Sequence, residues 1–235
     1  MKDYFYDLHI HSCLSPCGSN DATPADLAGM YALAGYQIVA LTDHNTVGNC
    51  AAFCKAAAHY GLLALPGMEL TTAEEVHVVC LFPDLDSANA FGEYVRAHLP
   101  PIPNRPDFFG QQLLMDEEDN ILGEETALLI GATDIPYCSV NQLVQSYGGA
   151  AYPAHIDHDS FSLSSNLGLW IPEAGFKFAE LSPTCPDGFI NRPDLAGVCF
   201  LTDSDAHYLH EIPDPIHTLA LEELSVKAII DLIKT

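Results

Sequence analysis

Short apolar runs alternate with amphipathic stretches along the whole chain, and this alternation limits the possible folds more than any other feature. Strand-like runs are expected at 4–11, 38–41, 62–65, 76–82, 149–153, 177–181, 197–202 and 217–221. The run at 38–41 is apolar at every position, as in a parallel strand covered on both faces. Strands that alternate with helices indicate an α/β architecture, either a barrel or an open sheet.

Signals for helix ends lie between these runs. Thr23 and Pro24 predict an N-cap followed by proline at the first helical position, and Gly35 predicts the end of that helix. An alanine-rich helix is expected over 48–60. Serines are expected to cap three further helices: Ser87 for 88–98, Ser139 for the helix that ends at Gly148, and Ser225 for the C-terminal helix.

Residues 100–138 interrupt the alternation. The segment PPIPNRP cannot continue a helix, and LLMDEEDNIL is typical of a short hairpin with an acidic turn. Since no Ser/Gly-rich linker or charge run separates two halves, we predict one domain over 1–235 with an excursion at about 100–138. The excursion is either a lid near a functional site or a surface elaboration.

Composition and charge restrict the partners. The 235 residues are 49% hydrophobic, which is enough for one sizeable core. A net charge of −24 repels polyanions, so we expect no extended nucleic acid as partner, whereas a small phosphorylated substrate held by metal ions is compatible. No signal peptide is evident and no apolar run approaches the ~20 residues that span a bilayer. We therefore expect a cytoplasmic protein without membrane contact, whose eight cysteines are reduced.

Histidines and acids stand in short clusters, nearly all of them at the ends of the apolar runs. The candidate metal ligands are His9, His11, Asp21, His44, Glu69, His77, His155, Asp205 and His207. His9 and His11 occupy positions i and i+2 of a strand, so both rings project from one face. In parallel α/β folds the C-terminal strand ends gather around one site. Nitrogen and oxygen ligands delivered there indicate a polynuclear metal site, and from it a hydrolase.

Some of these residues have expected individual roles. Glu69 follows the run LLALPG and can bridge two metal ions about 3.5–4 Å apart. Asp43 is expected to hold His44 by a hydrogen bond rather than to bind metal itself. Arg105 and Arg192 are the candidate substrate-binding residues, because a guanidinium group can bind phosphate through two parallel hydrogen bonds.

The set of motifs resembles the PHP (polymerase and histidinol phosphatase) family of metal-dependent phosphoesterases. DLHIHS resembles its first motif, LTDHN its second, the histidine of PAHID its third and SDAH its fourth. Their order and approximate spacing hold from residue 7 to about residue 210. The resemblance implies a distorted (β/α)7 barrel with three divalent transition metals, zinc, iron or manganese, at the C-terminal strand ends.

The resemblance also implies how the ligands are shared. One metal would take His9, His11, Glu69 and Asp205, a second Glu69, His77 and His155, and the third His44 and His207 with one further ligand. The chain departs from the commoner HSxxSDG pattern, because Pro16 stands five residues after His11. Asp21 is therefore the predicted further ligand, and Cys17 is the alternative.

The function implied is that of a metal-dependent phosphoesterase. We expect it to hydrolyse a small phosphomonoester through a hydroxide that bridges two metals, with Glu69, Asp205 and His207 as catalytic residues. A nucleotide phosphatase or nuclease would use the same site. An amidohydrolase is a further alternative, although no metal-bridging lysine stands beside the motifs. A non-catalytic metal-binding module is the last alternative, and the completeness of the ligand set argues against it.

Overall fold

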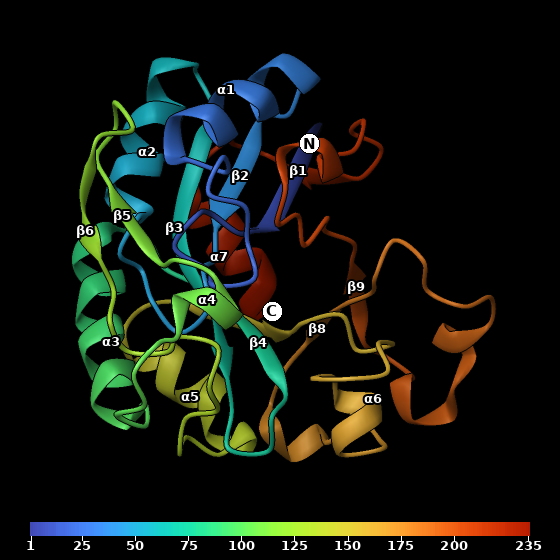
Figure 1. The fold of residues 1–235 in the computed structure, drawn as a ribbon. Helices are drawn as coiled ribbons and strands as arrows, with labels where there is room; N and C mark the ends of the chain where they lie inside the picture. Colours follow the sequence, from blue (N-terminus) through green and yellow to red (C-terminus); the bar gives the residue numbers. More distant parts are fainter.

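A six-stranded mixed sheet forms the centre of the fold in the computed structural model, which describes residues 1–235 (Figure 1). Its order is β10-β1-β2-β3-β4-β7. The strands are β1 Lys2–Ile10, β2 Ile38–Leu41, β3 Leu63–Thr71, β4 His77–Leu81, β7 Ala150–Pro153 and β10 Thr218–Leu221. Strands β1, β2 and β3 pair in parallel, whereas β4 is antiparallel to both of its neighbours and β10 is antiparallel to β1. The predicted α/β class is confirmed.

Two smaller strand pairs complete the set. Strands β8 (Phe178–Glu180) and β9 (Cys199–Leu201) pair in parallel, and β5 (Leu113–Met115) and β6 (Ile121–Glu124) form the expected hairpin. The segment after β9 returns to β1 through a parallel bridge between Ile10 and Ala206. The central sheet therefore curls into a half-barrel, and β8 and β9 lie beside its open side (Figure 1).

Helices cover the sheet on both faces. They are α1 Pro24–Ala34, α2 Cys50–His59, α3 Leu85–His98, α4 Pro106–Phe109, α5 Tyr137–Ser146, α6 Leu163–Asn166 and α7 Val226–Lys234. Three predicted helix ends are confirmed. The Thr23 side chain accepts from the Asp26 N–H, Gly35 has a left-handed φ of 99°, and the Ser225 side chain accepts from the Ala228 N–H. None of the helices combines the length and the apolar character that a membrane span needs.

Three sequence-based boundaries are wrong. Helix α3 starts earlier than predicted, because the Asp84 carboxylate rather than Ser87 caps it and accepts from the Ser87 N–H at 2.8 Å. Helix α5 starts at Tyr137 instead of after Ser139, and its first N–H donates to the distant Glu74 carboxylate. Strand β3 extends to Thr71, because β4 folds back and pairs with its second half.

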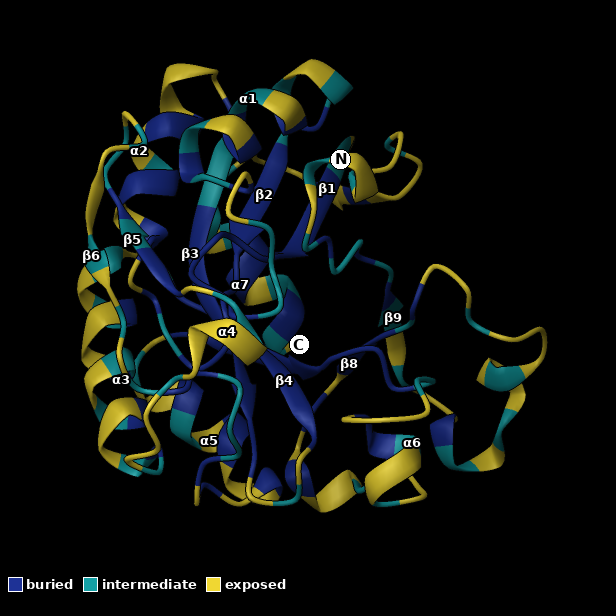
Figure 2. Cartoon of the chain, viewed as in Figure 1, coloured by how far each residue is buried: buried dark blue, intermediate teal, exposed yellow.

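Two apolar clusters form the core. The larger contains residues of α1, α2, α3 and α5 with one face of the sheet, and the smaller packs the isoleucines of α7 against the other face. Strand β1 contributes to both, since Leu8 belongs to the smaller cluster and Ile10 to the larger. Strands β2, β3 and β4 are buried along most of their length, whereas the longer helices expose one face (Figure 2).

The excursion at 100–138 packs on the turn that follows β1. The side chain of Asn49, just before α2, donates to the Leu113 carbonyl and accepts from the Met115 N–H, both at 3.0 Å. A Cβ on Gly110 would lie 2.6 Å from the Pro16 carbonyl, so the two backbones are in direct contact. The hairpin is thereby attached to the segment that carries His11.

Candidate metal centre

Five imidazoles surround the carboxylate of Glu69, whose side chain is 1% exposed. The ring nitrogens that approach its two oxygens are His9 Nε2 at 3.3 Å, His11 Nε2 at 3.4 Å, His44 Nδ1 at 2.8 Å, His77 Nδ1 at 2.7 Å and His155 Nε2 at 3.1 Å. One buried carboxylate is thus shared by histidines from four different segments of the chain.

The sheet explains why these segments meet. The chain after β2 continues beside β3, and a parallel bridge joins His44 to Glu69. His77 pairs with Thr71 across the β3–β4 hairpin. Thr71 is two residues after Glu69 in β3, so the side chains of His77 and Glu69 lie on the same face of the sheet. His77 is the first residue of an antiparallel strand, and Glu69 lies inside β3 rather than after it. The site residues therefore gather at one edge of the sheet without all following C-terminal strand ends.

Asp205 and His207 complete the cluster from the segment after β9. Asp205 Oδ1 lies 3.3 Å from His9 Nε2 and 3.2 Å from His11 Nε2. The ring of His207 stacks on His11 with 4.1 Å between centroids, and its Nδ1 lies 2.8 Å from the Asp205 carbonyl. Asp205 and His155 have positive φ angles of 52° and 27°, a conformation that costs free energy for residues with a Cβ.

The structure does not bring Asp21 to this cluster. Its side chain is exposed, and it belongs to none of the groups of close ligand atoms, which are His11–His44–His207, His9–His11–Asp205 and His44–Glu69–His77. Cys17 stands there instead, with Sγ 3.2 Å from His44 Nε2. The tight turn after β1 carries position 17 toward the histidines and leaves position 21 at the surface.

Neither candidate arginine lies at the cluster. Arg105 is exposed and stacks on Phe108. Arg192 forms an ion pair with Asp194 at 2.7 Å and donates to Ser164 Oγ and the Gly168 carbonyl. The donors of Arg192 therefore hold a loop together, and no arginine or lysine lines the pockets beside the cluster.

Glu180 contacts the cluster and was missed by the sequence-based reasoning. It ends β8, is fully buried, and its Oε2 lies 2.8 Å from His9 Nδ1. A carboxylate in this position orients the ring and directs the opposite nitrogen toward the centre of the site. The available signal was an acid at the end of the apolar run FKFAEL.

Asp43 acts differently from the prediction. Its carboxylate accepts from the Ser12 N–H and from the Ser15 hydroxyl, both at 2.7 Å, rather than from His44. Ser15 Oγ in turn lies 2.9 Å from His11 Nδ1. Asp43 therefore positions His11 through Ser15, because the turn after β1 folds over the end of β2.

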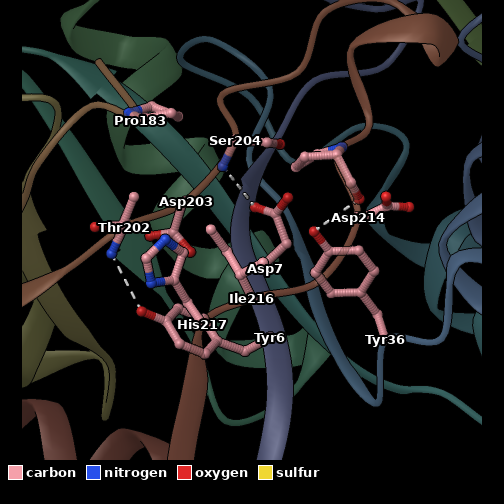
Figure 3. A pocket seen from close by; sticks show the side chains of 11 residues that line it. Tyr6, Asp7, Tyr36, Pro183, Thr202, Asp203, Ser204, Asp214, Ile216 and His217 are labelled. Carbon is pink, nitrogen blue, oxygen red and sulfur yellow. Dashed lines mark hydrogen bonds between the residues drawn. The ribbon is translucent and has the colours of Figure 1, made fainter. Parts of the chain in front are cut away.

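Buried acids also fix the backbone behind the cluster, around a small cavity of about 60 Å³ (Figure 3). Asp7 accepts from the Ser204 N–H at 3.2 Å, and Asp203 accepts from the Leu8 N–H at 2.7 Å. Burial raises the pKa of Asp7 to about 6 and holds the pKa of Asp203 well above its usual range. These bonds join β1 to the segment that carries Asp205.

The cluster has the properties of a cation site. Five acids are buried (Asp7, Asp43, Glu69, Glu180 and Asp203), and no lysine or arginine is buried with them. Buried charges in proteins are normally paired or bind metal. Several buried polar atoms lack a hydrogen-bond partner, among them His77 Nε2, His155 Nδ1 and Glu180 Oε1. The residues present therefore fit divalent metal ions.

One distance and the protonation state of two rings agree with this fit. His9 Nε2 and His11 Nε2 face each other at 3.1 Å, close to the roughly 3.4 Å that separates two imidazole ligands of a tetrahedral zinc. Burial lowers the pKa of His77 to about 4 and that of His207, also beside His11, to about 3. Both rings are therefore neutral at neutral pH, which is the form that binds metal, whereas neighbouring anionic groups outweigh burial and raise the pKa of His11 and His44 to about 9. The pKa of Glu69 stays well below its usual range, because the imidazoles around it outweigh its burial.

Two adjoining pockets open onto the cluster, with volumes of about 440 and 200 Å³. His155, His158, Asp205 and His207 line both of them. The side chains of Asp205 and His207 are 23% and 19% exposed, whereas that of Glu69 is almost inaccessible. A substrate would therefore meet the Asp205 and His207 side of the cluster first.

The model of one protein family, the PHP domain, matches residues 7–161. The chain belongs to the PHP domain family. The resemblance inferred from the four motifs is confirmed, although Asp205 and His207 lie beyond the matched residues. No curated protein sequence matches the chain.

Solved structures share the fold of this PHP chain at low identity. Endonuclease Q, in complex with a 27-mer duplex substrate with an abasic lesion, is 17% identical with a TM-score of 0.71. A Bifidobacterium adolescentis protein described as a metal-dependent phosphoesterase is 19% identical, with a TM-score of 0.60 over 97% of this chain and 94% of its own. An amidohydrolase from Chromobacterium violaceum with bound sulfate and no metal is 22% identical, with a TM-score of 0.60 over 94% of this chain and 93% of its own. The similarity to endonuclease Q covers 99% of this chain, which spans a little over half, 57%, of that protein.

The comparison with endonuclease Q contradicts the expectation that no extended nucleic acid is a partner. A protein with this fold was solved on a DNA duplex. The expectation rested on the net charge of −24, which is a sum over the whole chain. Binding depends on the local potential, and bound cations can reverse its sign at a site.

Proposed function

We propose that this protein hydrolyses phosphoesters with metal ions held by the cluster around Glu69. The observation that carries the proposal is the convergence of six histidines with Glu69 and Asp205 beside an open pocket, in a chain of the PHP family. Bound there, divalent ions would activate water and neutralise charge on the phosphoryl oxygens.

The donor set supports three transition metals, from zinc, iron or manganese. Imidazole suits these ions better than it suits calcium or magnesium. In this proposal Glu69 bridges two of them, Asp205 and His207 complete the site on the substrate side, and the other histidines hold the ions in place. Glu180 and Ser15 orient His9 and His11 through hydrogen bonds to their distal nitrogens.

We further propose that seven strands form a distorted (β/α)7 barrel within one domain over 1–235. Support comes from the Ile156 N–H, which donates to the Glu180 carbonyl at 2.9 Å and links the end of β7 to β8. The bridge between Ile10 and Ala206 links the end of β9 to β1. The excursion at 100–138 would border the site, because Ile130 lines the smaller pocket.

Two substrate classes each have a specific observation in their favour. A pocket of about 440 Å³ has the size of small-ligand sites, which favours a small phosphomonoester. The shared fold with endonuclease Q favours a phosphodiester in a nucleic acid strand. The metal cluster would serve either class, so the proposal concerns the phosphoester bond and its substrate has to be measured.

The test is a hydrolysis panel with protein reconstituted in zinc, iron or manganese and with chelated protein. The panel contains sugar and nucleotide monophosphates, a chromogenic phosphodiester, and oligonucleotide duplexes with and without an abasic lesion. We expect turnover of at least one phosphoester class with metal and none after chelation. His155→Ala should abolish this turnover, whereas the exposed His59→Ala is the matched control and should retain it.

If no phosphoester is hydrolysed under any metal condition while the ions do bind, the reaction proposed here is wrong. Amide or lactone hydrolysis under the same conditions would support the amidohydrolase alternative instead.

A further inference from the structure

Cys17 lies beside His44 on the open side of the cluster. Its Sγ is 3.2 Å from His44 Nε2, and the residue lines the larger pocket together with Asp205 and His207. The other cysteines are not among the residues that line the two site pockets. Cys17 is therefore the only cysteine that lines either of the two site pockets.

The turn that carries Cys17 holds a defined conformation. The Gly18 N–H donates to the Ser15 carbonyl at 2.9 Å, and the Ser19 N–H donates to the His207 carbonyl at 3.0 Å. A Cβ on Gly18 would lie 2.8 Å from the Ser12 carbonyl, so only glycine fits at that position. The turn is thus fastened to the backbone of His207, and the thiol is held in place from both sides.

No carboxylate belongs to the group of close ligand atoms next to Cys17. His11, His44 and His207 place ligand atoms within 4.8 Å of one another, and theirs is the one group of the three that contains no carboxylate. A thiolate would add a negative charge to this group. Sulfur and nitrogen ligands of a tetrahedral zinc stand roughly 3.6 Å apart, close to the separation of Cys17 Sγ and His44 Nε2.

We infer that the Cys17 thiolate is a ligand of the metal ion held by His44 and His207. The inference rests on the part of the proposed function that places metal ions in the cluster. It extends that proposal by naming a ligand of one ion. A sulfur ligand favours zinc and cobalt over manganese and magnesium at this position. It also makes one metal of the cluster sensitive to reagents that modify thiols.

The experiment compares the unmodified protein with Cys17→Ala, Cys17→Asp and the exposed Cys138→Ala as matched control. Each is stripped of metal and reloaded with cobalt(II), whose bond to a thiolate produces a charge-transfer band in the near ultraviolet. We expect the band in the unmodified protein and in the control, and its absence in both Cys17 variants. Metal content should fall by about one ion per chain in Cys17→Ala, and Cys17→Asp should regain that ion with an oxygen ligand.

Alkylation provides a readout independent of spectra and of activity. Removal of metal should accelerate alkylation of Cys17 at least tenfold, mapped by mass spectrometry, and should leave the rate at Cys138 unchanged.

Two outcomes would overturn the inference: an unaltered cobalt band in Cys17→Ala, or alkylation of Cys17 at the same rate with and without metal. If the unmodified protein binds metal and hydrolyses phosphoesters in that case, the proposed function stands and only the sulfur ligand is wrong. If the unmodified protein binds no metal, the inference and the proposed function fail together.

Discussion

Glu69 is the residue that the largest number of site side chains contact. Glu69→Gln should reduce kcat/KM by more than about 100-fold, because five imidazoles share the Glu69 carboxylate. Loss of a residue that only hydrogen-bonds to a metal ligand typically costs about 10–100-fold. His44→Ala should cost less activity, since in the proposed ligand scheme that ring would hold one ion, whereas Glu69 would hold two. Steady-state kinetics on a phosphoester substrate compare the two variants. If His44→Ala is inactive while Glu69→Gln keeps most of its activity, Glu69 is not the residue that bridges two metal ions.

Glu180 illustrates a positioning role. Its carboxylate lies against His9 Nδ1, so Glu180→Ala should lower metal affinity or activity by about 10–100-fold through loss of ring orientation. Competition with a fluorescent chelator measures the metal affinity, and Glu180→Gln, which can still accept the hydrogen bond, should recover part of it. The exposed Glu173→Ala is the control. Unchanged affinity in Glu180→Ala would show that His9 is oriented without it.

At the scale of elements, one side chain joins α2 to the excursion. Asn49 is fully buried and bonds to the backbone on both sides of Leu114, so Asn49→Ala leaves a carbonyl and an N–H without partners. We expect a loss of about 2 kcal/mol in unfolding free energy. For a domain of this size that lowers Tm by roughly 4–8 °C. Thermal melting of Asn49→Ala and of the exposed Asn20→Ala provides the measurement, and equal Tm values would refute the role assigned to Asn49.

At the scale of the whole molecule, the metal ions should stabilise the fold. The chain carries a net charge of −24, and no lysine or arginine is buried with its five buried acids, so bound cations would offset part of the negative charge of the folded state. Ions that bind only the folded state, at a free concentration a hundred times their Kd, raise the free energy of unfolding by about 2.7 kcal/mol. Chelation should therefore lower Tm by roughly 5–11 °C, and added zinc should restore it. Calorimetry that shows no shift on chelation would count against a metal centre in this cluster.

The order of strands and helices could be predicted from local pattern. Apolar runs with a period of two, the Thr23–Pro24 cap and the Ser225 cap depend on neighbours in the chain, and the structure contains each of them. The histidines at 9 and 11 were identified because i and i+2 share a face of a strand. Short-range geometry therefore determined the α/β class, whereas the resemblance of the four motifs indicated the family.

The tertiary structure decided what depends on residues far apart in sequence. Glu180 reaches His9 across 171 positions, and Cys17 rather than Asp21 stands beside His44 because a tight turn is fastened to the backbone of His207. The start of α5 depends on Glu74, which is 63 residues away. By itself, the sequence determined which elements form and which side chains can bind metal. Long-range packing decided which of those side chains lie together. A buried charged group or a buried N–H group forms its hydrogen bond with the partner that the fold brings within reach.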